Sequence, residues 1–303
     1  NMLGIVIANW NGEKLIDKCL LSLENQLFKD FKIYIIDNNS KDNSINIINT
    51  YSEKLNIDLT KMEYNSGFAP ANNIGIKKAI DEGCNYILTL NNDVEVPSDS
   101  LIKAMKFIES QKEFDIFQLF MINYFERNKC DAAGLVFNEK LIPSQVGYRE
   151  EVDQVLSREI SIEGACAGAA IYSSKALEKV KLDNGDYFDS KFFAYYEDVD
   201  LSLRLKRAGF KAVTLKESIV YHMHSATGNK TSGFKEYYLA RNLFMYTKRN
   251  QPLERYKKAK KTYYIILAIN LLRNFNMDVL KSVFKGIKDG NKEVKDIEYK
   301  DFN

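Results

Sequence analysis

The sequence predicts an α/β fold in which helices flank a mostly parallel sheet. Short apolar runs alternate with segments of helical periodicity through the first hundred residues, beginning with a strand-like run at 3–8. This alternation is typical of strand–helix–strand units, whose strands pair in parallel. Polar residues follow each apolar run, as expected where strands end at a ligand-binding edge. With 303 residues, of which 45% are hydrophobic, the chain is long enough to bury a substantial core.

The predicted elements follow one another at short intervals. After the first strand they are a helix over 15–27, a strand at 32–36, a helix over 42–54, a strand at 59–64, a helix over 71–82 and a strand at 86–90. The pattern is less regular from 94 to 224, with a helix over 98–112, a strand at 114–121 and a polar, irregular stretch over 143–158. Beyond 234 the pattern is helical. We therefore divide the chain into 1–95, 96–245 and 246–303, with the first two parts sharing one sheet.

Composition disfavours several classes of protein. The formal net charge is +2, so the overall charge does not point to a nucleic-acid partner. The four cysteines lie far apart without a CxxC pair, which indicates neither a disulfide framework nor a thiolate zinc site. We find no signal-peptide pattern and no apolar run near the roughly 20 residues that a spanning helix needs. We therefore expect a cytoplasmic protein that does not cross the membrane.

Polar side chains are concentrated at the ends of the first four predicted strands. Asn9 and Asn11 follow the first strand, 37–40 the second, 65–67 the third and 91–93 the fourth. In parallel sheets of this kind, ligands bind beyond the carboxyl ends of the strands. These residues are therefore expected to converge around one ligand.

The tripeptide Asn91-Asn92-Asp93 offers a carboxylate and amide oxygens at a strand end. Such oxygens can hold Mg²⁺ or Mn²⁺ against a diphosphate. Taken alone, the tripeptide is more often an ordinary turn whose side chains bond to their own backbone.

The segment 65–75 joins a predicted strand to a predicted helix through Gly67 and the two amides Asn72 and Asn73. Small side chains let a ligand approach the backbone, and a helix N-terminus favours an anionic phosphate. A plain strand-to-helix connection explains the segment equally well. Neither GxGxxG nor GxxxxGK[ST] occurs there, so dinucleotide and P-loop sites are disfavoured. The small-residue run at 164–170 fits either a tightly packed strand or a floor beneath a substrate.

Three carboxylates, Glu197, Asp198 and Asp200, follow an aromatic run at 192–196. Neighbouring carboxylates raise one another's pKa, so a dense group in an apolar setting suggests a bound cation or a basic task. The structural alternative is that Asp198 caps the following helix while Asp200 complements its dipole. Capping explains one Asp, but it explains neither Glu197 nor the aromatics, some of which we expect to pack in the core.

The only two histidines of the chain, His222 and His224, follow an apolar run. Side chains two residues apart share a face of an extended segment, so both can approach one site. A lone histidine is more often structural than a ligand, although imidazole is a common ligand of transition metals.

Taken in order, these segments resemble the family 2 glycosyltransferases, especially the bacterial branch of rhamnosyltransferases and related polysaccharide-building enzymes. The resemblance covers nearly the whole chain. Its motifs are Ala8-Asn9-Trp10-Asn11, Asp37-Asn38-Asn39-Ser40 with Asp42, the segment 65–75, Leu90-Asn91-Asn92-Asp93, the small-residue run at Gly164, Glu197-Asp198-Val199-Asp200, His222, and Tyr237-Tyr238 with Arg241-Asn242. Each motif is weak evidence alone, but their order makes the match specific.

The resemblance implies a GT-A fold with an acceptor-binding lobe and a helical C-terminal extension at 246–303. It implies that 1–95 binds the nucleotide sugar and that 96–245 carries the metal, catalytic and acceptor sites. The residues assigned to the nucleotide sugar are Asn9, Asn11, Asp37, Asn39, Gly67, Asn72, Asn73 and Asn91.

The resemblance also implies an inverting, metal-dependent transfer. Asp93 and His222 are the implied ligands of Mn²⁺ or Mg²⁺. The implied catalytic residues are Asp198, as the base, and Glu197 beside it. The chain departs from the family's Asp-x-Asp motif, which here reads Asn91-Asn92-Asp93 and leaves fewer charges on the metal.

The implied donor is a nucleoside diphosphate sugar, linked to dTDP or UDP. The implied acceptor is a hydroxyl of a growing glycan or a lipid-linked saccharide in cell-surface polysaccharide synthesis. A nucleotidyltransferase would share the sheet and the acidic ligands, but it would open with a glycine-rich basic loop that residues 9–12 do not supply. A non-catalytic nucleotide-sugar binding protein is the other alternative, and the intact Glu197-Asp198 pair argues against it.

The C-terminal part carries a basic run within 248–261 that precedes an apolar run at 263–272. This order suits peripheral contact with an anionic membrane surface, at the inner face of the cell membrane. A helix packed on the catalytic domain explains it equally well.

Overall fold

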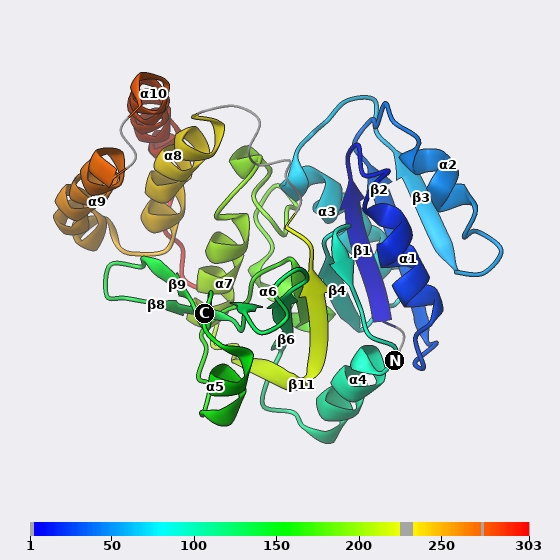
Figure 1. Ribbon diagram of the computed structural model, residues 1–303. Coiled ribbons are helices and arrows are strands. Elements are labelled where there is room, and N and C mark those ends of the chain that lie inside the picture. Colours follow the sequence, from blue (N-terminus) through cyan, green and yellow to red (C-terminus); the bar gives the residue numbers. More distant parts are fainter. Residues whose placement is uncertain (1–2, 225–232, 274–275, 303) are drawn as a thin grey trace.

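The computed structural model describes residues 3–224, 233–273 and 276–302. Its centre is a nine-stranded sheet with the order β3-β2-β1-β4-β10-β6-β11-β5, and β7 pairs with β6 (Figure 1). The strands are β1 (Leu3–Asn9), β2 (Phe31–Asp37), β3 (Ile57–Lys61), β4 (Tyr86–Leu90), β5 (Val94–Glu95), β6 (Ile116–Asn123), β7 (Cys130–Ala132), β10 (Ala169–Ser173) and β11 (Ala212–His222). A separate hairpin consists of β8 (Leu135–Phe137) and β9 (Pro143–Gln145).

Most of the long pairings in the sheet are parallel, which confirms the predicted fold class. β1 pairs in parallel with β2 and β4, β2 with β3, and β6 with β11. The antiparallel strands are β10, which lies between β4 and β6, and the short β5 and β7. The carboxyl ends of β1, β2 and β4 therefore meet at one edge of the sheet.

Helices cover both faces of the sheet. One layer holds α1 (Ile16–Glu24), α2 (Ser44–Asn49) and α4 (Ser100–Ser110), and the other holds α3 (Phe68–Asp81), α6 (Ser174–Val180) and α7 (Glu197–Arg207). In β1, Ile5 and Ile7 enter the first layer and Val6 enters the second, because successive side chains of a strand alternate between faces. Burial on both faces explains why the predicted strands read as continuous apolar runs.

A third apolar cluster joins the C-terminal helices to the sheet domain. It contains Val199 and Leu203 of α7 together with residues of α8 (Phe234–Arg249), α9 (Leu253–Arg273) and α10 (Met277–Glu293). Figure 1 shows these three helices side by side on the flank of the molecule away from β1. The predicted helical C-terminal extension is confirmed. None of the helices in the described part of the chain has the length and apolar character needed to span a bilayer.

The prediction of an irregular stretch at 143–158 is wrong in part, because the stretch contains β9 and α5 (Val152–Ser157). The helix is short, and its one fully buried residue, Val155, packs with Phe120 and Cys130. One buried apolar residue in a polar segment produces no helical pattern in the sequence, so this helix could not be predicted. Its burial depends on strands far away in the sequence.

Candidate active site

Side-chain hydrogen bonds link the ends of β2, β1 and β4. The Nδ2 atom of Asn9 donates to Oδ1 of Asp37 at 2.9 Å, and Nδ2 of Asn92 donates to Oδ1 of Asn9 at 2.9 Å. Asn9 is fully buried, so it acts as a bridge within this edge. Asp37 also accepts hydrogen bonds from the backbone and the hydroxyl of Ser40, at 2.9 and 2.6 Å. The orientation of the Asp37 carboxylate is therefore fixed.

Asn11 and Asn39 lie in the two loops that follow β1 and β2. Both adopt positive φ, 48° and 62°, a region that Asn tolerates better than most residues. The Oδ1 atom of Asn11 accepts from the backbone of Lys41 at 2.9 Å, and Nδ2 of Asn39 donates to the carbonyl of Glu63 at 2.7 Å. The predicted donor-binding asparagines thus shape the loops around Asp37.

Gly67 brings the loop before α3 into contact with the segment before α7. Its φ is 92°, and a Cβ at this position would come within 2.7 Å of the carbonyl oxygen of Phe193. The next residue, Phe68, donates its backbone N–H to that same oxygen at 3.0 Å. Only glycine satisfies both the backbone angle and the close approach.

The two amides of α3 have hydrogen-bond partners within the protein. Nδ2 of Asn72 donates to the carbonyl of Phe68 at 2.9 Å. Oδ1 of Asn73 accepts from the backbones of Tyr187 and Phe188, and its Nδ2 donates to the carbonyl of Phe188 at 2.7 Å. Asn73 therefore fastens the segment 187–188 to α3.

Asp93 and His222 lie together where β5 pairs with the end of β11. The Oδ1 atom of Asp93 is 3.2 Å from Nε2 of His222, and both side chains are largely buried. Two ligands of one Mg²⁺ at neighbouring octahedral positions lie about 3 Å apart. These two atoms form an ion pair while the imidazole is protonated, and their spacing also fits a divalent cation, which would bind the deprotonated ring.

The other ring nitrogen of His222 is held by Asp131, which sequence reasoning did not identify. Nδ1 of His222 lies 2.6 Å from Oδ2 of Asp131, and Nε2 of His224 contacts the second oxygen. A carboxylate behind a ligating imidazole fixes its tautomer and orientation. Burial would lower the pKa of His222, but the hydrogen bonds to Asp131 and Asp93 raise it to about 10. Burial would raise the pKa of Asp131, but the two imidazoles lower it to about 2.

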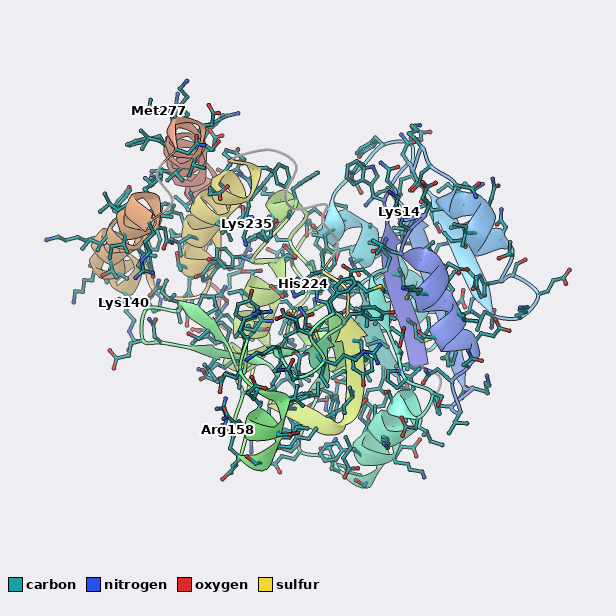
Figure 2. The ribbon with its side chains drawn as sticks, in the orientation of Figure 1. Lys14, Lys140, Arg158, His224, Lys235 and Met277 are labelled. Carbon is teal, nitrogen blue, oxygen red and sulfur yellow. The ribbon has the colours of Figure 1, made fainter. Side chains whose placement is uncertain are left out.

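The two histidines differ in their surroundings. His222 lies at the end of β11 with its side chain 14% exposed, whereas the side chain of His224 is 47% exposed. Figure 2 shows His224 near the middle of the view, beside the end of β11. Asp131, His222 and His224 offer three ligand atoms within 4.8 Å of one another. The only sequence signal for Asp131 is a carboxylate inside a short buried strand.

The pair Glu197 and Asp198 begins α7, beside the small-residue run. Oδ2 of Asp198 accepts from the backbone of Ala167 at 3.2 Å, and the next residue, Gly168, accepts from the backbone of Asn91 at 2.9 Å. A Cβ on Gly168 would lie 3.2 Å from Nδ2 of Asn91. The segment 164–168 precedes β10 and links Asp198 to Asn91 through these backbone hydrogen bonds.

Both carboxyl groups of this pair have a raised pKa. Burial and the charge of Asp198 raise the pKa of Glu197 to about 8. Burial also raises the pKa of Asp198, although hydrogen bonds from the backbones of Ala167 and Val199 oppose the shift. One oxygen of Glu197 has no hydrogen-bond partner among the residues that the structure describes. Carboxyl groups in this condition suit proton transfer near neutral pH.

Asp200 has a different environment from the other two carboxylates. It is fully buried and pairs with Arg204 at 2.9 Å, with Arg249 at 3.2 Å and with Nδ2 of Asn250 at 2.9 Å. Burial opposes ionisation, but the two arginines lower its pKa. This network ties α7 to α8. The capping alternative for Asp198 is wrong, because Tyr196 precedes the helix without a side-chain cap and Asp198 lies in the first turn.

The loop that leads into α7 holds an unusual backbone conformation. Phe193, Tyr195 and Tyr196 all have positive φ, between 61° and 68°. The side-chain amide of Asn242 donates to the carbonyls of Phe192, Ala194 and Tyr195, at 3.1, 2.8 and 2.8 Å. Strained backbone of this kind persists only where surrounding contacts hold it, and it is concentrated at functional sites.

The aromatics of this loop divide between the core and the site. Phe192 is fully buried, and Tyr196 packs edge-on against Tyr246. Phe193 stacks on Tyr238 of α8 with ring centroids 5.4 Å apart. The predicted core packing of some aromatics is thus confirmed, and Phe193 lies next to Gly67.

The family model for glycosyl transferase family 2 matches residues 4–181, which is more than half of the sequence. The chain belongs to glycosyl transferase family 2. Its sequence is 36% identical over 127 residues to a poly(ribitol-phosphate) beta-glucosyltransferase of Bacillus spizizenii, covering 40% of this chain and 19% of that enzyme. It is 30% identical over 108 residues to TarS of Staphylococcus aureus, a poly(ribitol-phosphate) beta-N-acetylglucosaminyltransferase, covering 35% of this chain and 18% of TarS. The alignments therefore span about a fifth of these relatives.

Solved structures share the fold. A crystal structure of residues 1–349 of S. aureus TarS with UDP-GlcNAc superposes with a TM-score of 0.66 at 17% identity, covering 97% of this chain and 82% of that one. GalNAc-T7 with UDP, GalNAc and Mn²⁺ superposes with a TM-score of 0.59 at 13% identity, covering 87% of this chain and 55% of that one. Together with the strand order, these likenesses confirm the GT-A fold.

Proposed function

We propose that the protein is an inverting, metal-dependent glycosyltransferase that transfers a sugar from a nucleoside diphosphate to a hydroxyl of a cell-surface polymer or its lipid-linked precursor. The observation that carries the proposal is the connection between the Asp93–His222 pair and the Glu197–Asp198 pair. Asn91 lies two residues before Asp93 and donates its backbone N–H to the carbonyl of Gly168. The neighbouring Ala167 donates its backbone N–H to Asp198, so the two pairs are linked through Ala167-Gly168. A donor diphosphate and an acceptor hydroxyl can therefore meet over one floor.

The nucleotide is assigned to the edge formed by Asn9, Asp37 and Asn39. The Asp37 carboxylate is held in place by Asn9 and Ser40, as a group that recognises a base or ribose requires. TarS, which shares this fold, was crystallised with UDP-GlcNAc. This supports a UDP-linked donor over the dTDP-linked alternative.

Asp93 and His222 would hold a divalent cation against the donor diphosphate, with Asp131 orienting the imidazole. The cation would neutralise charge on the leaving diphosphate. Mn²⁺ and Mg²⁺ both accept oxygen ligands, and the imidazole favours Mn²⁺ of the two. The Mn²⁺ in the GalNAc-T7 structure agrees with this choice.

Asp198 would accept the proton of the acceptor hydroxyl as its oxygen attacks the anomeric carbon. The new C–O bond forms on the face opposite the diphosphate, the bond to the diphosphate oxygen breaks with its electron pair, and the configuration inverts. General-base assistance of this kind contributes roughly 10² to 10⁴ in rate. Glu197 would stay protonated beside the ionised Asp198, since its own pKa is about 8.

The acceptor is assigned to a cavity of about 500 Å³ beside the strained loop. Phe193, Tyr237, Tyr238 and Arg241 line it, together with Ser190, Lys191, Lys292 and the acidic Asp289 and Glu293. Aromatic faces suit sugar rings, and the three cationic side chains suit phosphate, so a phosphate-bearing glycan polymer fits this lining. The named activities of the Bacillus and Staphylococcus relatives, which act on poly(ribitol phosphate), support the same class.

The deciding experiment incubates the purified protein with a panel of UDP- and dTDP-sugars, Mn²⁺ and poly(ribitol phosphate), and measures release of the nucleoside diphosphate. We expect acceptor-dependent release that Asp198→Asn lowers by roughly two to four orders of magnitude. Binding of a donor without transfer to any acceptor would favour the non-catalytic alternative. Release of pyrophosphate from a nucleoside triphosphate would favour a nucleotidyltransferase.

A further inference from the structure

Helix α9 packs on the protein with only one of its faces. Its buried residues are Tyr256, Ala259, Tyr263 and Leu267, which recur every three or four positions. They belong to the third apolar cluster, which also contains residues of α7, α8 and α10. The apolar run at 263–272 is therefore divided between two faces of the helix. Tyr263 and Leu267 of this run are buried in the packed face, in line with the packed-helix alternative that the sequence left open.

The outward face of α9 changes from basic to apolar along its length. Ile265, Ile269 and Leu272 are 49%, 43% and 80% exposed, and their spacing of four and three residues puts them on one stripe. Lys258 and Lys261 precede Ile265 by seven and four residues, so they lie on the same stripe. Exposed aliphatic side chains are common one at a time, but a row of them behind lysines is not.

The outward face of α10 repeats this combination. Met277 and Phe284 are 56% and 61% exposed and lie seven residues apart. Lys281 and Lys288, each four residues beyond one of them, are exposed on the same stripe. Figure 2 shows Met277 at the outer end of the helix, away from the body of the protein.

α10 is seated firmly on α8. A Cβ on Gly290 would come within 2.7 Å of the carbonyl oxygen of Arg241, and one on Gly286 would overlap the carbonyl oxygen of Tyr237. This close packing fixes which face of α10 points outward. The packing of α10 on α8 also connects α10 to the loop that leads into α7, because Asn242 of α8 holds that loop by hydrogen bonds.

The lysines on these faces are available for an external partner. Within the described ranges, Lys258, Lys261, Lys281 and Lys288 form no ion pair, whereas lysines elsewhere, such as Lys77 and Lys103, pair with an Asp four residues away. Unpaired lysines beside exposed aliphatic and aromatic side chains complement a surface that offers phosphates above an apolar layer.

We propose that the outward faces of α9 and α10 bind an anionic lipid bilayer. Ile265, Ile269, Leu272, Met277 and Phe284 enter the interface, and the lysines contact lipid phosphates. The helices lie on the bilayer and do not cross it. Such docking places the active site beside a membrane, where a lipid-linked or membrane-attached acceptor is found, but it does not depend on sugar transfer.

The test is flotation of the purified protein with phosphatidylcholine vesicles, with and without phosphatidylglycerol, and with no donor or acceptor present. We expect binding only to the anionic vesicles, weakened by added salt. Lys281→Glu/Lys288→Glu should lower the partition coefficient by more than about tenfold, because each lysine near an anionic surface contributes about a factor of five. The control Lys106→Glu/Lys112→Glu makes the same charge change at exposed positions on α4 and just beyond its C-terminal end, and it should bind like wild type.

A second variant, Ile269→Ser/Leu272→Ser, tests the apolar part and should lose binding while its melting temperature stays near that of wild type. The proposal fails if the protein binds anionic and neutral vesicles equally, or if Lys281→Glu/Lys288→Glu and Lys106→Glu/Lys112→Glu bind the anionic vesicles alike. It also fails if Ile269→Ser/Leu272→Ser converts a dimer into a monomer without affecting flotation, since the face would then bind a second copy of the chain. Sugar transfer by a protein that does not float would leave the proposed function intact.

Discussion

His222 is held between two carboxylates, with Nδ1 2.6 Å from Asp131 and Nε2 3.2 Å from Asp93. The first contact sets the direction of the ring, and the second marks where a cation would bind. The position of His222 therefore depends on Asp131, which the family motif does not include. His224 contacts the same Asp131 carboxylate from a more exposed position.

We predict that Asp131→Asn weakens Mn²⁺ binding by roughly 10- to 100-fold, the usual cost of losing a carboxylate behind a ligating histidine. Asp93→Ala and His222→Ala should weaken it more, because they remove ligands. Isothermal titration of the protein with Mn²⁺ measures this without relying on turnover. His224→Ala is the matched control and should have the smallest effect. Full transferase activity in excess EDTA would contradict the metal site altogether.

We predict that Asp198→Asn lowers kcat by roughly two to four orders of magnitude, because the proton acceptor is lost while the shape of the side chain is kept. Donor affinity should stay near the wild-type value. In the wild type, the acidic limb of the kcat profile should lie above the usual range of an Asp, since burial raises the pKa of Asp198.

Asp200→Asn is the control for this experiment. Removing one partner of a buried ion-pair network costs about 3 to 5 kcal/mol of unfolding free energy. The variant should therefore be less stable, but its folded fraction should keep most of its kcat. If Asp198→Asn kept more than roughly a tenth of wild-type kcat, the assignment of the base would be wrong.

The sequence predicted well both the sheet and the meeting of polar residues at one of its edges, because both depend on local patterns. The runs that form β1, β2 and β4 are buried on both faces, and strands of this kind read as continuous apolar segments. The residues that follow these strands could be placed at one edge because the carboxyl ends of parallel strands lie on the same side of a sheet. Asp93 and His222, 129 residues apart, were paired by the family motif and are adjacent in the structure.

Contacts between distant segments were not predictable in this way. Asp131 meets His222 only because β7 pairs with β6, next to β11, and nothing in residues 130–132 indicates this. Asn73 was assigned to the donor on its position in a loop motif, but its amide is bonded to 187–188. The ion pairs of Asp200 depend on Arg249 of another helix. Each of these three contacts depends on how helices and strands that are distant in the sequence pack together.

We predict that Asn242→Ala loosens the loop before Glu197 and lowers kcat, with little change in donor affinity. Asn242 is a positioning residue, since it touches three backbone carbonyls and no reacting group. Loss of these buried hydrogen bonds should cost about 2 to 4 kcal/mol of unfolding free energy. Hydrogen exchange should show faster exchange of the amides of 193–196 in the folded variant. Unchanged exchange with a lower stability would mean that Asn242 only supports the packing of α8.

Our last prediction concerns Glu197 and the pH dependence of stability. Its pKa is about 8 in the folded protein and 4.5 when unperturbed, because burial and the charge of Asp198 disfavour ionisation. Between these values the folded protein holds a proton that the unfolded chain has released. The free energy of unfolding contributed by Glu197 therefore falls as the pH rises from about 4.5 to about 8.

Glu197→Gln removes this titration. The variant should have nearly the stability of the wild type at about pH 5, and should exceed it by about 1 to 3 kcal/mol at about pH 8.5, where the wild type carries a buried charge. Urea denaturation at both pH values measures the difference. Glu13→Gln makes the same change of carboxyl to amide at an exposed position of the first half and is the matched control. Parallel pH profiles for wild type and Glu197→Gln would mean that Glu197 ionises in the folded protein as it does in water, and the proton-holding role beside Asp198 would have to be given up.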